Sequence, residues 1–445
     1  MTSVAELTAA EQQRFAELHP RCGELWRAGE VYMPDGVPML WMAKWPGPWP
    51  LHVEDASGAH FRCADDIDFV DLCLGDTGAM CGHAPPATVA AISAQLLKGS
   101  TFMLPTASAR DAAALLEQRF GLPLWQFTLS ATDANRSLIR YARQVTGRPR
   151  ILVIDKCYHG TVDEAYAELE NGEVVSRRGN IGAPVPLGQT TAVVPFNDLA
   201  AMERALRRLD VAAVLIEPAM TNIGIVLPDD GWHEAVRDLC TETATLLIID
   251  ETHTLSAGPG GMTLRDGLEP DAVVVGKTIA GGIPAGAYGM TADLAERVRS
   301  SLELEDIDVG GVGGTLAGNA VSMAGIVATI GEVLTAEAYP AMIDRATEWT
   351  TGVQQAIDEF GLPWQVTQLG ARSEYSFRAN PPANGAEAAD ADDFELQQFL
   401  HLHALNRGIL MTPFHNMALM CPVTTSADVE RHTAAFRDAL EALTA

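Results

Sequence analysis

The chain has 445 residues, 47% of them hydrophobic and 20% charged, and a formal net charge of −28 at pH 7. A chain of this length is too long for one simple core and predicts a large domain with smaller appendages. The negative charge would repel nucleic acids and anionic membranes, so the composition argues against both as partners.

Residues 1–20 are charged and helical in pattern, and Thr8 and Glu11 have the spacing of a capping box. They contain no apolar core of a signal peptide, and no stretch of the chain reaches membrane-spanning length. The expected location is therefore the cytoplasm. The cysteines are scattered singly, without a CxxC pair or the spacing of metal ligands: Cys22, Cys63, Cys73, Cys81, Cys157, Cys240 and Cys421. We expect reduced thiols packed as small hydrophobes, and no metal site.

Residues 1–75 predict a helix, a loop rich in proline and tryptophan, and short strands. From about Gly82 onward, helical patterns alternate with short apolar runs. The runs predict strands at 124–130, 150–155, 212–219, 245–251 and 272–277. Helices are predicted at 85–99, 108–120, 134–147, 198–209, 231–244, 319–334, 340–360 and 426–443. The polar stretch 380–393 predicts an exposed loop.

Continuous apolar strands separated by helices are typical of an α/β fold with a mainly parallel sheet covered on both faces. In such sheets the functional side chains lie at the C-terminal ends of the strands. The C-terminal part of the chain, after the long helical run, predicts a smaller α/β domain.

Two of the predicted strands end in side chains with complementary chemistry. The run LLIID ends at Asp250, and the run AVVVGK ends at Lys277, before a series of glycines and other small residues. A lysine amine can bind an aldehyde as a Schiff base, and a carboxylate can keep a pyridine nitrogen protonated. One carboxylate and one lysine delivered by successive strands therefore predict a pyridoxal phosphate site.

Each of these residues taken alone has a commoner explanation. Lys277 could simply reach solvent from the end of a strand, and Asp250 could cap the following segment. Gly276, Lys277 and Thr278 match the last three letters of a P-loop, but Asp271 stands where that loop needs a glycine. Neither glycine stretch spells a complete dinucleotide-binding fingerprint. The occurrence of Asp250 and Lys277 together favours the pyridoxal phosphate interpretation.

A phosphate anchor is predicted between the strand that ends at Ser130 and the helix that follows. Ser130, Ala131 and Thr132 offer hydroxyls and free backbone N–H groups at a helix N-terminus, which suits a dianion. A plain N-cap by Thr132 is the alternative, and the two are compatible. Tyr158, after the next strand, could stack on a flat cofactor or be a core tyrosine. Thr315 follows two glycines in what could be a second phosphate loop.

Taken together, these residues resemble the class III pyridoxal-phosphate aminotransferases, in the branch that contains glutamate-1-semialdehyde aminomutase and β-amino-acid transaminases. The resemblance runs from about Met33 to the C-terminus. Its markers in chain order are Gly82-His83-Ala84-Pro85, Ser130–Asn135, Tyr158-His159-Gly160, Glu217-Pro218, Asp250-Glu251, Gly276-Lys277 and Gly314-Thr315. It implies fold type I, with a large cofactor-binding domain over 81–325 and a small domain formed by 1–80 and 326–445.

The resemblance also implies a role for each matching residue. Lys277 would be the Schiff-base lysine and proton shuttle, Asp250 the partner of the pyridine nitrogen, and Tyr158 the residue stacked on the ring. Thr315 of the partner subunit would reach the phosphate, which implies a homodimer with shared active sites. The remaining phosphate contacts would come from Ser130, Ala131 and Thr132.

The sequence departs from the family pattern at four places. Ala131 stands where the phosphate turn usually has glycine. Thr252 replaces a common valine and would lie under the ring. His253 stands where glutamine or methionine is usual, and it could hydrogen-bond the phenolic oxygen of the cofactor, tune its imine, or be a passive neighbour. Relatives that bind a substrate carboxylate place an arginine near the start of the chain, whereas Lys44 is the only cation in residues 33–45.

The last departure bears on the substrate. Trp41, Met42 and Trp45 predict an apolar, aromatic entrance, which favours a hydrophobic amine or an amino acid whose carboxylate binds elsewhere. The candidate cations for binding that carboxylate are Arg372, Arg378 and His415. For Arg372, the alternative is an internal ion pair with Glu374, which lies on the same face of the strand.

These observations predict an aminotransferase that moves an amino group from an amine or a β- or ω-amino acid to a keto acid such as pyruvate, in a ping-pong reaction. The alternative is an aminomutase of the glutamate-1-semialdehyde type or an epimerase, because both need the same lysine and ring. A catalytically silent ligand-binding relative is the third hypothesis, and the intact Asp250 and Lys277 argue against it.

Overall fold

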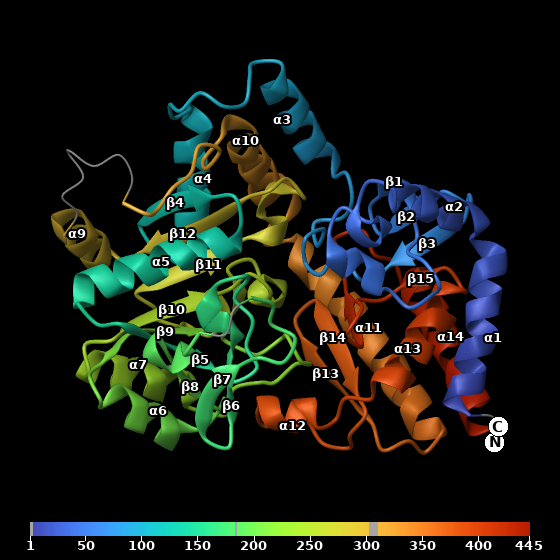
Figure 1. The fold of residues 1–445 in the computed structure, drawn as a ribbon. Coiled ribbons are helices and arrows are strands. Elements are labelled where there is room, and N and C mark those ends of the chain that lie inside the picture. Colours follow the sequence, from blue (N-terminus) through green and yellow to red (C-terminus); the bar gives the residue numbers. More distant parts are fainter. Residues whose placement is uncertain (1–2, 183–184, 302–309) are drawn as a thin grey trace. The chain divides into compact units, whose positions relative to one another are not determined.

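The computed structural model describes residues 3–182, 185–301 and 310–445, which form two compact units (Figure 1). The larger unit comprises residues 86–336 and 382–390. The smaller unit comprises residues up to 85, 337–381 and 391–445, so both ends of the chain contribute to it. In the described part, no single helix is both long and apolar enough to cross a membrane, although one bent pair, Ala320–Val333 with Ala338–Glu359, passes on length and composition.

The larger unit is built around a seven-stranded sheet, and this confirms the predicted α/β fold with a mainly parallel sheet. The strands β4, β11, β10, β9, β5 and β8 run parallel, and β12 is antiparallel to both of its neighbours. The sheet order is β4 (Leu124–Thr128), β12 (Gly286–Met290), β11 (Ala272–Val275), β10 (Leu246–Asp250), β9 (Val211–Ile216), β5 (Arg150–Ile154) and β8 (Thr191–Val194).

The sequence did not predict β12, because glycine is a poor strand former. A methyl group on Gly289 would lie 2.6 Å from the ring of Trp125, so this glycine lets the indole pack against the strand. The helices of this unit are α3 (Pro86–Leu96), α4 (Ala107–Phe120), α5 (Ala131–Thr146), α6 (Leu199–Leu206), α7 (Trp232–Glu242), α8 (Gly261–Arg265), α9 (Ala292–Ser301), α10 (Ala320–Ala328) and α12 (Gly385–Ala389). A ribbon of β6 (Ala167–Glu170) and β7 (Glu173–Ser176) completes it.

Helix α5 packs against the sheet and begins at the candidate site. Its apolar side buries Leu138, Ile139 and Ala142 against β4, β9, β11 and β12. It begins three residues after β4 ends and stops at Gly147, whose left-handed φ of 68° terminates the helix. The N-terminus of α5 therefore lies at the C-terminal end of β4.

The smaller unit contains two small sheets and the remaining helices. One sheet has the order β1 (Val53–Ser57), β2 (His60–Cys63), β3 (Asp68–Asp71) and β15 (Ile409–Leu410), and the other β13 (Gln365–Leu369), β14 (Arg372–Ser376) and β16 (Met417–Leu419). The helices are α1 (Val4–Leu18), α2 (Pro20–Gly29), α11 (Ala338–Glu359), α13 (Phe394–Leu405) and α14 (Ser426–Thr444).

Two local predictions were wrong. The capping box of α1 is formed by Ser3 and Glu6, because the helix already begins at Val4, and Glu11 instead pairs with His403 at 3.0 Å. The polar stretch 380–393 is not wholly an exposed loop. It contains α12, which Asn384 caps, and a methyl group on Gly385 would lie 2.7 Å from the carbonyl oxygen of Asp155.

Candidate active site

Asp250 and Lys277 lie at the C-terminal ends of two neighbouring parallel strands. Asp250 is the last residue of β10 and pairs in register with Val274 of β11. Lys277 follows β11 after Gly276 and begins the short 3₁₀ helix η6 (Lys277–Ala280). Because parallel strands end at the same edge of a sheet, both side chains leave the sheet at the edge where ligands bind in open α/β folds.

The carboxylate of Asp250 is almost fully buried and surrounded by hydrogen-bond donors. Its Oδ2 accepts a hydrogen bond from Asn135 Nδ2 at 2.9 Å and lies 3.1 Å from His159 Nδ1. Its Oδ1 accepts one from the backbone N–H of Thr252 at 3.0 Å. These contacts come from α5, from the loop after β5 and from the turn after β10, so three elements fix the direction of one carboxylate.

These neighbours also keep Asp250 charged. Burial raises the pKa of Asp250, but the hydrogen bond and charge of His159, with hydrogen bonds from Thr252 and Asn135, more than offset burial and leave the pKa below its usual value. Burial lowers the pKa of His159, whereas its interactions with Cys157 and Asp250 raise it on balance. The directions of the two shifts favour the charged forms of both side chains, which are almost fully buried.

Lys277 has an unusual backbone conformation and a defined side-chain partner. Its φ of 52° lies in the left-handed region, which costs a non-glycine residue on the order of 1 kcal/mol. Its Nζ lies 2.9 Å from Nε2 of His253, which precedes the short helix η5 (Thr254–Ala257). The sequence had placed His253 toward the cofactor or as a passive neighbour. In the structure His253 contacts the amine itself.

The predicted phosphate turn forms the first turn of α5. Ser130 is the N-cap, and its Oγ accepts a hydrogen bond from the backbone N–H of Asp133 at 3.2 Å. The N-cap is thus Ser130, and the alternative in which Thr132 caps the helix was wrong. Thr132 Oγ1 instead accepts a hydrogen bond from the N–H of Thr161 at 3.2 Å. Helix N-termini attract anions through their free N–H groups and the helix dipole.

Two glycines allow the surrounding loops to approach this turn closely. A methyl group on Gly160 would lie 2.0 Å from Thr132 Oγ1, and one on Gly276 would lie 2.9 Å from Ala131 Cβ. Gly160 also has a φ of 76°. The methyl group of Ala131 therefore lies against the residue that precedes Lys277, and this brings the anion-binding turn next to the lysine.

The other predicted cofactor residues lie in the same unit. Tyr158 is half-buried in the loop after β5, next to His159. Thr252 is 5% exposed and follows Asp250 by two positions. Thr315 lies in the turn before α10 and is exposed. No hydrogen bond is recorded for the side chain of Thr315 among the described residues.

Three of the predicted substrate residues gather around one ring in the smaller unit. The rings of Trp41 and Phe414 are 5.9 Å apart, and Lys44 Nζ lies 5.9 Å from the centre of the Phe414 ring. Trp41 and Lys44 belong to the short 3₁₀ helix η2 (Leu40–Lys44), and His415 follows Phe414 directly. Trp45 stands edge-on to Trp41 at 5.8 Å. The predicted aromatic environment is therefore present.

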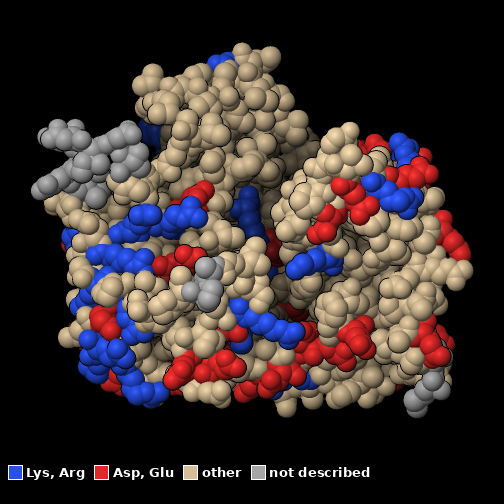
Figure 2. All heavy atoms as spheres, in the orientation of Figure 1, with Lys and Arg blue, Asp and Glu red and all other residues tan. Residues whose placement is uncertain are grey.

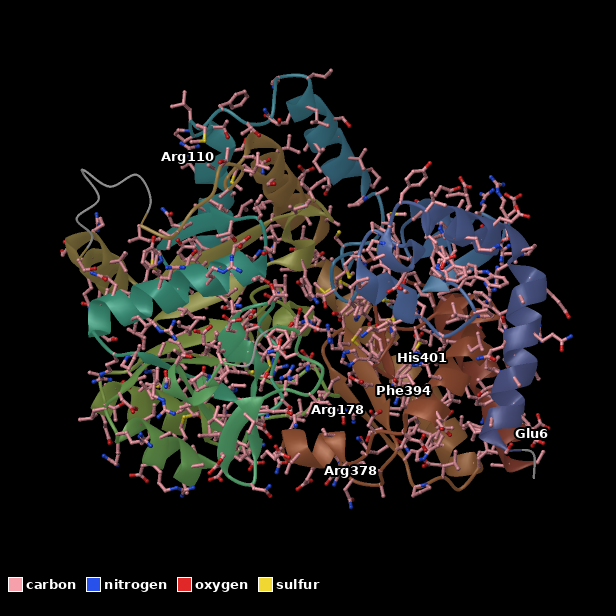
Figure 3. All side chains as sticks on the ribbon, in the orientation of Figure 1. Glu6, Arg110, Arg178, Arg378, Phe394 and His401 are labelled. Atoms are coloured by element: carbon pink, nitrogen blue, oxygen red, sulfur yellow. The ribbon has the colours of Figure 1, made fainter. Side chains whose placement is uncertain are left out.

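The remaining cation candidates of this unit lie on and after β14. Arg372 is 1% exposed and donates a hydrogen bond from Nη2 to Thr77 Oγ1 at 2.5 Å. Glu374, its predicted partner, lies 3.5 Å from His415 Nδ1. Burial lowers the pKa of His415, and the contact with Glu374 raises it above its usual value. Arg378 follows the end of β14 and is half-buried (Figure 3).

Two cavities formed by described residues lie apart from Lys277 and Asp250, which line neither of them. One, of about 630 Å³, lies in the larger unit, is lined by Arg136, Arg140 and Arg143 of α5, and belongs to a surface where charges of both signs are interspersed (Figure 2). The other, of about 590 Å³, lies in the smaller unit and is mainly apolar. Met42 and Trp45 line it.

The groups at the strand ends fit pyridoxal phosphate. A buried, ionised carboxylate suits a protonated ring nitrogen, a lysine amine suits an aldehyde, and a helix N-terminus suits a phosphate. All three sit on one edge of one sheet. Sequence reasoning missed Asn135 and His159 as the partners of Asp250, although both lie inside segments that it quoted as family markers.

Comparisons with known proteins agree with this geometry. The model of the class-III aminotransferase family matches residues 41–440. A solved glutamate-1-semialdehyde-aminomutase from Pseudomonas aeruginosa PAO1 is 47% identical, covers 98% of either chain and has a TM-score of 0.97. The glutamate-1-semialdehyde 2,1-aminomutase of Nitratidesulfovibrio vulgaris (strain Miyazaki F) is 32% identical over 89% of this chain and 92% of its own. A solved omega-transaminase from Sphaerobacter thermophilus is 28% identical, covers 94% of this chain and 97% of its own, and has a TM-score of 0.84.

The match extends over nearly the whole chain and includes both strand ends that carry Asp250 and Lys277. The chain therefore belongs to the class III aminotransferase family, with the fold of type I and pyridoxal phosphate as its cofactor.

Proposed function

We propose that this protein is an aminomutase of the glutamate-1-semialdehyde type, which moves an amino group between neighbouring carbons of one substrate. The observation that carries the proposal is the 47% identity, over nearly the full length, to a solved protein described as a glutamate-1-semialdehyde-aminomutase. This reverses the order of the two hypotheses drawn from the sequence, which put intermolecular transfer first.

The proposed mechanism assigns one task to each group at the strand ends. When bound, pyridoxal phosphate supplies an aldehyde that takes up the substrate amine and an electron-poor ring that makes the adjacent carbon acidic. Lys277 would hold the aldehyde through Nζ, and its free amine would serve as the base that moves a proton at the reacting carbon. His253, 2.9 Å from Nζ, is placed to share the proton of that amine.

Asp250 and the first turn of α5 position the cofactor at its two ends. The ionised carboxylate of Asp250 holds the ring nitrogen protonated, and Asn135 and His159 fix its direction. Ser130, Ala131 and Thr132 hold the phosphate at the N-terminus of α5. Tyr158 and Thr252 would contact the cofactor ring, one on each face. The preorganised charges act in a nearly dry site, where they are stronger than in water.

The substrate carboxylate needs a cationic partner. In residues 33–45 the only cation is Lys44. Lys44 is exposed and lies over the ring of Phe414, beside Trp41 and His415. We assign carboxylate recognition to this group, with Arg372 as a positioning residue because it is 1% exposed and bonded to Thr77. Trp41 forms the apolar wall.

A transaminase is the second candidate, and one observation favours it. The arginine with which relatives bind a substrate carboxylate is absent from residues 33–45, and the surroundings of Lys44 are aromatic. An apolar amine would suit that environment better than a small substrate that carries a carboxylate.

Half-reactions distinguish the two candidates. The holoenzyme incubated with glutamate-1-semialdehyde and no amino acceptor is expected to give an isomerised product, followed by mass spectrometry or chromatography, with turnover independent of added pyruvate. Lys277→Ala is the negative control. Release of a ketone or aldehyde in an amount equal to the enzyme, with further turnover only after pyruvate is added, would instead establish the transaminase.

We further propose that the protein is a homodimer with shared active sites. Thr315 is exposed, which suits a residue that reaches the phosphate in the partner's site. The same unit exposes a group of large apolar side chains on α3 and the loop after it, a composition typical of a subunit interface. They are Val89, Leu96, Leu97, Phe102, Met103 and Leu104.

If the active sites are shared, a substitution at Thr315 should weaken the binding of pyridoxal phosphate. Thr315→Ala is expected to raise the Kd for pyridoxal phosphate by roughly 10- to 100-fold, because it removes one hydrogen bond to a charged group. Equilibrium dialysis measures the Kd, and light scattering measures the mass. Thr351→Ala, an exposed threonine on α11, is the matched control. A monomeric holoenzyme, or equal affinity in both variants, would refute the shared site.

A further inference from the structure

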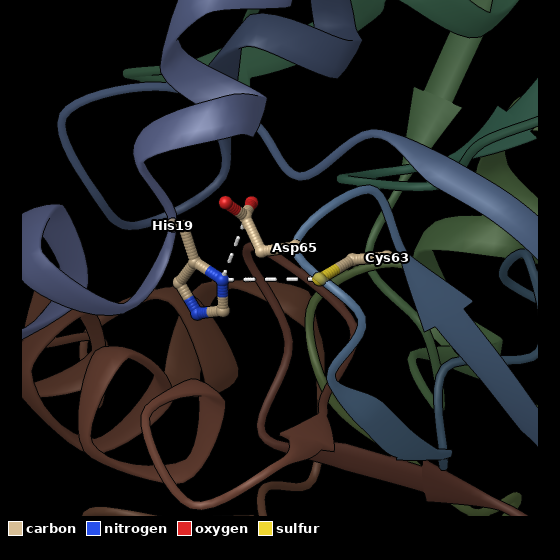
Figure 4. Close-up of side chains that lie close together, drawn as sticks. All are labelled: His19, Cys63 and Asp65. Atoms are coloured by element: carbon tan, nitrogen blue, oxygen red, sulfur yellow. Dashed lines mark hydrogen bonds and ion pairs between the residues drawn. The ribbon is translucent and has the colours of Figure 1, made fainter.

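Three potential metal ligands meet in the smaller unit, whereas the residues assigned to the cofactor belong to the larger unit. His19 precedes α2, Cys63 ends β2, and Asp65 lies in the turn after β2 (Figure 4). His19 Nδ1 lies 3.8 Å from Cys63 Sγ and 3.9 Å from Asp65 Oδ2. All three ligand atoms lie within 4.8 Å of one another.

Cys22 lies beside this cluster, although its sulfur is outside the set of atoms that lie within 4.8 Å of one another. It lies in the first turn of α2, and its thiol interacts with both Cys63 and Asp65. The backbone N–H of His52 donates a hydrogen bond to Cys22 Sγ at 3.3 Å. The same thiol donates a hydrogen bond to the carbonyl oxygen of His52 at 3.9 Å.

The cluster is buried in an apolar core and lacks a cationic side chain. His19 is 1% exposed, Cys22 and Cys63 are fully buried, and the side chain of Asp65 is 5% exposed. The neighbours are mainly apolar and include Phe15, Phe61 and Phe69. Among the residues that the structure describes, no lysine or arginine side chain pairs with Asp65. A carboxylate buried without a cation is costly, and a bound metal ion would supply the missing charge.

The distances suit a small tetrahedral ion. With zinc bonds of about 2.3 Å to sulfur and 2.0–2.2 Å to nitrogen and oxygen, the ligand atoms of a tetrahedral site lie roughly 3.3–3.8 Å apart. The two observed distances from His19 Nδ1 are within a few tenths of an ångström of that range. A small contraction would close the site.

We propose that His19, Cys22, Cys63 and Asp65 form a structural site for a zinc ion. His19, Cys63 and Asp65 supply three ligands, and movement of the neighbouring Cys22 thiol into the site would close the coordination sphere, as is typical of structural zinc. The ion would fasten the N-terminal helices α1 and α2 to the sheet of β1, β2 and β3. The site is independent of the proposed reaction, because none of its ligands belongs to the cofactor-binding set.

A purely structural role for the carboxylate is the competing explanation. Asp65 accepts hydrogen bonds from the backbone N–H groups of Arg21 at 2.7 Å and Cys22 at 3.0 Å, and so caps the N-terminus of α2. This cap explains Asp65 alone. It does not explain why two thiols and an imidazole converge on the same carboxylate. Hydrogen bonds from N–H groups to a metal-bound carboxylate are usual.

The test begins with the unmodified holoenzyme, purified with reductant and washed with a weak chelator to remove adventitious ions. Elemental analysis is expected to find about one zinc per chain. Exchange for Co²⁺ is expected to give the intense red-region absorption of tetrahedral cobalt, where pyridoxal phosphate does not absorb. A strong chelator should lower the Tm, and added Zn²⁺ should restore it.

Variants then locate the ion. Cys22→Ser and Cys63→Ser are each expected to weaken zinc binding by at least about tenfold. Cys240→Ser, which alters a fully buried cysteine of the larger unit, is the matched control and should keep the metal. Wild-type protein that takes up no Zn²⁺ under reducing conditions, a Cys22–Cys63 disulfide in mass spectra, or full binding by Cys63→Ser would overturn the proposal. The first two measurements use wild-type protein, so they stand even if a variant fails to fold.

Discussion

Replacement of Lys277 by alanine is expected to reduce turnover by more than about 10³-fold, because it removes the amine that is proposed to hold the aldehyde and move the proton. The visible absorption band that depends on the lysine–cofactor linkage should disappear as well. Steady-state kinetics and an absorption spectrum of the reconstituted protein measure both effects. Lys277→Arg, which keeps the charge but is too basic to act as a base, should be inactive too.

Lys156 provides a matched control for this experiment. It also follows a buried parallel strand, β5, and it also has a left-handed backbone, with a φ of 67°. Its amine forms an ion pair with Glu168 at 2.6 Å, outside the proposed catalytic set. Lys156→Ala should therefore keep turnover within a few-fold of wild type. If Lys277→Ala retained both activity and the visible band, the assignment of the catalytic lysine would be wrong.

The positions of Asp250 and Lys277 could be predicted because they depend on local patterns. Apolar runs such as LLIID and AVVV are buried along their whole length, so the pattern marks both the strand and its end. Parallel strands with helical crossovers then place their ends on one edge of the sheet. No information about distant parts of the chain is needed for that step.

The partners of Asp250 could not be predicted in the same way. Asn135 and His159 are 115 and 91 residues away in the sequence, and they reach the carboxylate only because of the strand order β10, β9, β5 and the path of α5 across the sheet. Sequence periodicity gives the strands but not their order. For the same reason the cluster of His19, Cys22, Cys63 and Asp65 could not be predicted, because its spacing in the sequence matches no metal-binding pattern.

Short irregular elements were the other source of error. β12 contains two glycines among five residues, so composition argued against a strand. Pairing with the neighbouring strands β11 and β4 places β12 in the sheet, and Gly289 leaves room for the ring of Trp125. The alternative N-cap of α5, Thr132, was also wrong, because the cap is Ser130. Serine and threonine are both good caps, and only the backbone of Ser130 has the extended conformation that a cap requires.

Asp250→Asn is expected to lower kcat/KM by roughly 10²- to 10³-fold, equivalent to about 2.7–4 kcal/mol of transition-state stabilisation. Asparagine has nearly the same shape, so the contacts with Asn135 and His159 keep their geometry while the negative charge is lost. The ring nitrogen would then no longer be held protonated. Kinetics gives the loss of rate, and equilibrium dialysis should show weaker binding of pyridoxal phosphate.

Asp155→Asn is the control, because Asp155 is also a buried aspartate next to a strand end, of β5, but its Oδ1 accepts a hydrogen bond from the backbone N–H of Leu169 at 2.8 Å. It should keep activity within a few-fold of wild type. Equal losses in both variants would mean that the effect of Asp250→Asn comes from lost burial energy rather than from the charge at the cofactor.

The pH dependence of kcat/KM provides a further test of whether the charge of Asp250 acts on the cofactor. The pKa of Asp250 in the folded protein lies below the reference value of 3.8, so the carboxylate is ionised throughout the neutral range. The stability that this ionised group contributes is present above its unfolded pKa and is lost as the pH falls through the lower folded pKa. The wild-type profile of kcat/KM should therefore show no step from Asp250 above about pH 5. A step in that range that vanishes in Asp250→Asn would show that the carboxylate is protonated in the active enzyme and cannot be the anion that holds the ring nitrogen.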